Sequence, residues 1–71
     1  MKELAQYDRV KLVTKKYIDD GVEYGSIGYI IEVYGTDSKE YEVEFSNSKT
    51  GETIAQIVTK QEEIELEVND V

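Results

Sequence analysis

The sequence predicts a small all-β domain in which five short strands curl into a barrel, with a long first loop and a short helical turn before the last strand. Apolar and polar residues alternate along most of the chain, which is the pattern of half-buried strands. Helical periodicity is weak, and clusters of Gly, Asp, Asn and Ser separate the alternating segments. The 71 residues fit one domain, expected to span residues 1–71 with its core in residues 7–68.

The first strand is predicted over residues 8–14, where Val10 and Leu12 alternate with polar neighbours and would face the core. Residues 15–24 follow as a loop, with a turn signal at residues 19–21, Asp-Asp-Gly. This loop is the longest connection that the pattern predicts.

The segment at residues 25–34 is rich in β-branched and aromatic residues and begins with Gly25 and Gly28. Glycines at the start of a strand favour a sharp bend or the close crossing of another strand. A bulge near Gly28 would swap the inward face of the remaining residues, so the sequence leaves the register of this segment open.

The clearest strand is predicted over residues 40–45, where Tyr41, Val43 and Phe45 share one face and three glutamates share the other. The other predicted segments are a turn at 35–39, a turn at 46–51, a strand at 52–59, a helical turn at 60–63 and a strand at 64–68. This order of strands, loop and turns is typical of a small SH3-like barrel. Closing the sheet would also remove its exposed edges.

Three segments resemble SH3-like domains of the KOW and related types: Asp8-Arg9-Val10, the Gly-x-x-Gly-x-Ile-Ile run at residues 25–31, and Tyr41-Glu42-Val43-Glu44-Phe45. Together with the long loop and the final strand, they make residues 7–68 similar to a small bacterial family, domain of unknown function 4926. The resemblance implies an SH3-like fold. Some members of that family are associated with toxin–immunity systems, which implies a protein-binding or inhibitor role by analogy.

The charge of the chain is acidic and uneven. Sixteen acidic and eight basic residues give a net charge of −8, and five of the eight bases lie in residues 1–16. A surface this negative repels phosphate backbones and attracts basic partners, so we expect a protein partner with a basic surface and no direct nucleic-acid binding. The alternative interpretation is that the charge only keeps a small protein soluble.

The chain lacks the groups on which most catalytic and metal sites depend. It contains no histidine and no cysteine, which removes the usual general base, the thiol nucleophile and the commonest transition-metal ligands. Asp19, Asp20 and Glu23 could offer oxygen ligands but lack the spacing of an EF-hand loop. We therefore expect no enzymatic activity, no cofactor and no metal site.

No apolar run approaches the roughly 18 residues of a membrane-spanning helix, and the first residues lack the apolar stretch of a secretion signal. We expect a cytoplasmic protein with no membrane partner.

The candidate partner-binding residues are acidic side chains on strands and tyrosines beside the acidic loop: Tyr17, Asp19, Asp20, Tyr24, Glu40, Glu42, Glu44, Glu65 and Glu67. The glutamates are expected in two rows, one on the strand at residues 40–45 and one on the last strand. The alternative for the rows is a solvated face that protects an edge by charge, and for Tyr17 and Tyr24 it is packing of the loop onto the barrel. Tyr41 and either Tyr29 or Tyr34 are expected to be buried or half-buried.

These observations predict an acidic protein-binding module, most simply an inhibitor or immunity-type protein that covers a basic site on its partner. The alternative is an SH3-like accessory subunit that docks on a larger enzyme or complex through apolar contacts. The oligomeric state is left open by the sequence.

Overall fold

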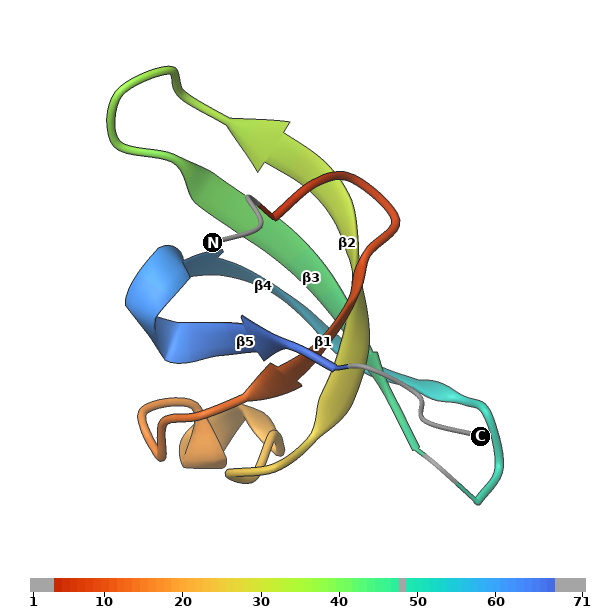
Figure 1. The fold of residues 1–71 in the computed structure, drawn as a ribbon. Helices are drawn as coiled ribbons and strands as arrows, with labels where there is room; N and C mark the ends of the chain where they lie inside the picture. The colour runs from red at the N-terminus through yellow and green to blue at the C-terminus, as the bar shows by residue number, and fades with distance from the viewer. Residues whose placement is uncertain (1–3, 48, 68–71) are drawn as a thin grey trace.

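The computed structural model, which describes residues 4–47 and 49–67, shows one antiparallel sheet that curls strongly around its core (Figure 1). The strands are β1 (Arg9–Leu12), β2 (Ile27–Tyr34), β3 (Glu40–Ser46), β4 (Thr53–Lys60) and β5 (Ile64–Leu66). Two short 3₁₀ turns complete the described elements, η1 (Ile18–Asp20) in the long loop and η2 (Gln61–Glu63) before β5. The predicted all-β class, long first loop and helical turn are confirmed.

The five strands pair in the order β4-β3-β2-β1-β5, so β2, β3 and β4 form a meander and β5 returns to lie beside β1. This order is compatible with the predicted SH3-like architecture. The predicted closure of the barrel is absent, because β4 and β5 remain the two edges of the sheet and only η2 connects them. The expectation that the fold removes its edges is therefore wrong.

β3 lies near the middle of the sheet and supplies the centre of the core. Tyr41 is 1% exposed, and Val43 and Phe45 are fully buried, as their alternation predicts. Val10 and Leu12 of β1 are also fully buried, which confirms their predicted inward face. The remaining buried apolar residues are Leu4, Val22, Ile30 and Ile64. Leu4 extends the core beyond the predicted start at residue 7, whereas Val68 lies outside the described residues.

Gly28 marks the close strand crossing that the sequence suggested. A Cβ atom added there would lie 2.6 Å from the Glu44 carbonyl oxygen and 2.7 Å from Cγ1 of Val43, so only glycine fits between β2 and β3. The pairing is regular at this point, with Gly28 opposite Phe45. The irregularity falls instead between Ile30 and Glu32, where Ile31 is the additional residue of a bulge.

The position of this bulge determines which side chains of β2 face solvent. Ile30 is buried before the bulge and Val33 packs against the core after it, so Tyr29 and Tyr34 both point outward. They are 48% and 43% exposed, respectively. The expectation that one of these two tyrosines is buried or half-buried is therefore wrong, whereas the expectation for Tyr41 is confirmed.

Candidate protein-binding surface

The solvent-facing side of β2, β3 and β4 combines carboxylates with exposed aromatic and aliphatic side chains. We call it the outer sheet face and define it by Tyr29, Glu32, Tyr34, Glu40, Glu42, Glu44, Gln56 and Val58. Strand alternation places these side chains opposite the buried ones, and cross-strand pairing sets Glu44 beside Tyr29 and Glu42 beside Val58. The predicted acidic row on β3 is thus embedded in a mixed surface.

The centre of this face concentrates negative charge. Glu32 and Glu42 are direct cross-strand partners next to the Ile31 bulge, an arrangement of like charges that destabilises a sheet. The Tyr34 hydroxyl donates a hydrogen bond of 2.5 Å to Glu42, and the Gln56 amide donates one of 3.2 Å to Glu44. The bond to Glu42 raises the pKa of Tyr34, with a smaller contribution from desolvation. Because both donors are neutral, these bonds orient the carboxylates without cancelling their charge.

The second predicted acidic row has different neighbours. Glu65 lies opposite Lys11 of β1, and its carboxylate is 3.9 Å from the Lys11 ammonium. The backbone N–H of Glu67, one residue beyond β5, donates to the carbonyl of Arg9. Two strands, β2 and β1, separate this row from β3. Glu65 therefore lies beside a basic side chain, Glu67 is joined to β1 through its backbone, and neither extends the acidic centre of the outer sheet face.

Tyr17 attaches the long loop to the body of the domain. Its ring packs against the core, and its hydroxyl donates a bond of 2.7 Å to Oε1 of Glu63 in η2. Glu63 is 8% exposed, accepts a second bond from the Lys60 N–H at 2.8 Å and lies 3.3 Å from the Lys16 ammonium. These contacts give Tyr17 the packing role that was the alternative to partner contact.

Burial by itself raises the pKa of Glu63, but the hydrogen bonds from Lys60 and Tyr17 and the charge of Lys16 outweigh it and leave this pKa below its ordinary value. Burial and the Glu63 carboxylate together raise the pKa of Tyr17. Glu63 is therefore a charged, well-satisfied group inside the fold, and no pattern in the sequence distinguishes it from the exposed glutamates around it.

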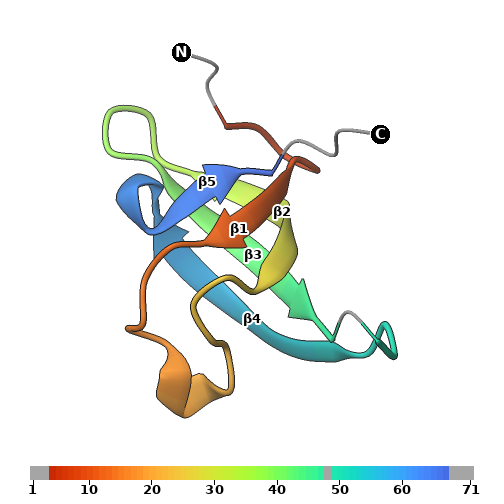
Figure 2. The ribbon, with the colours of Figure 1, turned by 60° about the horizontal axis from the view of Figure 1, so that its bottom comes forward.

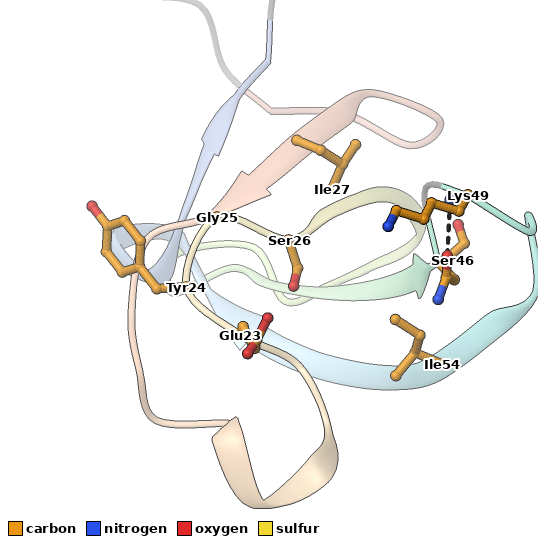
Figure 3. A pocket seen from close by; sticks show the side chains of 9 residues that line it. Glu23, Tyr24, Gly25, Ser26, Ile27, Ser46, Lys49 and Ile54 are labelled. Atoms are coloured by element: carbon orange, nitrogen blue, oxygen red, sulfur yellow. Dashed lines mark hydrogen bonds between the residues drawn. The ribbon is translucent and has the colours of Figure 1, made fainter.

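The other loop residues remain on the surface. Asp19 and Asp20 lie in η1 and are exposed, and Tyr24 is 57% exposed. Tyr24 lines a hollow of about 420 Å³ between the end of the long loop and the β3–β4 hairpin. In Figure 3 its ring is directed away from the other lining side chains, while Glu23 and Ser26 lie on the side that faces Ile54. This hollow and the outer sheet face are made by different sets of side chains.

Five members of the outer sheet face were not among the predicted site residues: Tyr29, Glu32, Tyr34, Gln56 and Val58. The β-rich run at residues 25–34 was visible, but a bulge changes the phase of alternation along a strand without a local signal. Among the described residues, no group of three or more acidic side chains is arranged to hold a metal ion. No helix in that part of the chain is long and apolar enough to cross a membrane.

Comparison with known proteins identifies a family but no characterised relative. The model of a domain of unknown function, DUF4926, matches residues 6–66. Neither the curated proteins nor the solved structures contain a match to this chain. The chain therefore belongs to the DUF4926 family, as the motifs of its sequence led us to expect.

Proposed function

We propose that this protein is a protein-binding module whose outer sheet face covers a basic site on a partner protein, in the manner of an inhibitor or immunity-type protein. The observation that carries the proposal is the concentration of Glu32, Glu42 and Glu44 beside exposed Tyr29 and Val58. Carboxylates on such a surface steer a basic partner, and tyrosine supplies contact area with few rotatable bonds. A cytoplasmic, bacterial setting remains part of this proposal.

The strain within the face supports the same role. The juxtaposition of Glu32 and Glu42 costs stability in the free protein, and a partner's arginine or lysine side chain between them would relieve that repulsion. A cation therefore binds more favourably to a surface with mutually repelling carboxylates than to one whose carboxylates already have basic partners. Glu65, with Lys11 at 3.9 Å, offers less.

A capture experiment from the source cytosol tests the proposal. The wild-type chain and the double variant Glu42→Lys/Glu44→Lys are immobilised, and bound proteins are compared at low and high salt. We expect the wild type to retain a basic protein that is released by salt and lost on the double variant. Asp37→Lys/Glu62→Lys is the matched control, because it changes the charge equally at exposed positions outside the face.

Two outcomes would contradict the proposal. One is equal capture by all three baits, and the other is capture that does not respond to salt. Equal capture would favour the alternative role as an accessory subunit that docks through apolar contacts. The exposed side chains of Tyr24 and Ile54 at the hollow support that second role, and Ile54→Ser would then be the variant that abolishes binding.

A further inference from the structure

β4 is an edge strand whose free side is weakly protected. It pairs only with β3, and in Figure 2 it runs along one border of the sheet. Within residues 4–47 and 49–67, the backbone of residues 53–59 makes no hydrogen bond to any loop or turn. Its outward N–H and C=O groups are therefore left for water or for another strand.

The two edges of the sheet differ in the devices that prevent strand addition. β5 has three residues and carries Glu65, and short length and charge both discourage pairing. β4 has eight residues, of which the first seven, Thr-Ile-Ala-Gln-Ile-Val-Thr, are uncharged and rich in β-branched side chains. Its protection consists of a bulge at Ile54 and a single terminal lysine, Lys60.

We propose that β4 pairs antiparallel with β4 of a second copy of this chain, about a two-fold axis at Gln56. This register sets Ala55 opposite Ile57, Ile54 opposite Val58, and Gln56 opposite its own copy. Val58 is 47% exposed in the single chain, so its burial against the second strand would remove apolar surface from water.

The ends of the strand make the self-pairing complementary in charge. Glu52 precedes β4 and Lys60 ends it, so an antiparallel pair brings opposite charges together at both ends. The long loop approaches β4 at the bulged end, where a Cβ added to Gly21 would lie 3.6 Å from Cγ2 of Ile54. The paired sheets would join two outer sheet faces into one larger acidic surface.

A charge swap at the two-fold axis tests this inference without any partner protein. In the dimer, Gln56→Lys places two lysines opposite each other. Within the single chain the new lysine lies opposite Glu44, so the substitution should not destabilise the fold. We expect it to raise the dimer dissociation constant, measured by sedimentation equilibrium, at least about tenfold. Gln56→Glu also sets like charges against each other at the axis, with added repulsion from Glu44 within the single chain. Mixing the two variants should restore a dimer through Lys–Glu pairing. Thr36→Lys, in an exposed turn, is the control for added charge.

Salt separates this inference from the proposed function. Each chain carries a net charge of −8, so salt should favour the dimer while it weakens a basic partner's binding. A wild-type chain that sediments as a monomer at all concentrations and both salt levels would overturn the inference. So would a Gln56→Lys/Gln56→Glu mixture that stays monomeric while each variant retains the circular dichroism spectrum of the wild type.

Discussion

Two hydrogen bonds of the same chemistry lie in opposite surroundings in this domain. Tyr17 donates to Glu63 at 2.7 Å across 46 positions of sequence, and the carboxylate is buried under the loop. Tyr34 donates to Glu42 at 2.5 Å across 8 positions, on the exposed outer sheet face. Geometry alone does not distinguish the two bonds, but access to water does.

The difference shows how burial assigns different roles to one pair of residue types. If the Tyr17–Glu63 bond is lost, a buried carboxylate loses a donor that water cannot readily replace, which costs stability. If the Tyr34–Glu42 bond is lost, water replaces it, so this pair adds little to stability and remains free to meet a partner. The first pair should respond to stability measurements and the second to binding measurements.

The largest expected effect follows from Glu63→Gln. The amide keeps the size of the carboxylate but loses its charge toward Lys16 and weakens the bonds from Tyr17 and the Lys60 N–H. We expect a loss of about 2 kcal/mol in the free energy of unfolding, because bonds to charged groups contribute more than neutral ones. Urea denaturation measures it, with Glu62→Gln as the exposed control in the same turn. Equal midpoints for the two variants would show that Glu63 does not anchor the loop.

Acidification should remove the same charge without a substitution. The pKa of Glu63 in the folded chain lies below its ordinary value of 4.5, so the unfolded chain binds this proton first as pH falls. The stabilisation is therefore fully present above pH 4.5 and is lost as pH falls through the folded pKa. Acidification also changes the charge of the other carboxylates. The measurement is therefore the difference in unfolding free energy between wild type and Glu63→Gln. This difference should shrink with acidification, and a constant difference would contradict the assignment.

A comparison of Tyr17→Phe with Tyr34→Phe addresses the two hydrogen bonds directly. Removing the Tyr17 hydroxyl takes one donor from Glu63 but leaves the Lys60 N–H, so we expect a loss of about 1 kcal/mol in unfolding free energy. Removing the Tyr34 hydroxyl should leave the urea midpoint unchanged, because water solvates Glu42 in its place. Equal losses in the two variants would mean that burial does not distinguish the pairs.

The parts of this structure that were predictable from the sequence are those with a local signal. Val43 and Phe45 were assigned to the core because a period of two is visible within one strand. The glycines of residues 25–28 indicated a sharp bend or a close strand crossing, and the crossing falls at Gly28. The charges of the β3 glutamates were visible in the same way, although their neighbours on other strands were not.

The parts that escaped prediction depend on contacts between distant segments. The bulge at Ile31 reverses the phase of β2 and exposes Tyr34, and no residue type announces it. Glu65 lies beside Lys11 only because β5 pairs with β1, which alternation cannot reveal. The Tyr17–Glu63 bond joins a loop to a turn at the opposite end of the sequence. A candidate site on a small sheet therefore needs the register before its charges can be interpreted.

The smallest expected effect concerns the charge that accompanies the buried pair. The Lys16 ammonium lies 3.3 Å from Oε2 of Glu63 and 5.6 Å from the centre of the Tyr17 ring, yet its side chain is 58% exposed. Exposed lysines lose side-chain entropy when they are held in place, so Lys16→Met should lower the unfolding free energy by at most about 0.5 kcal/mol. The effect should diminish further at high salt, whereas the effect of Tyr17→Phe should persist. Suppose instead that Lys16→Met and Glu63→Gln lower the unfolding free energy equally. The ion pair, and not the hydrogen-bonded carboxylate, would then hold the loop, and charge instead of burial would distinguish the Tyr17–Glu63 pair from the Tyr34–Glu42 pair.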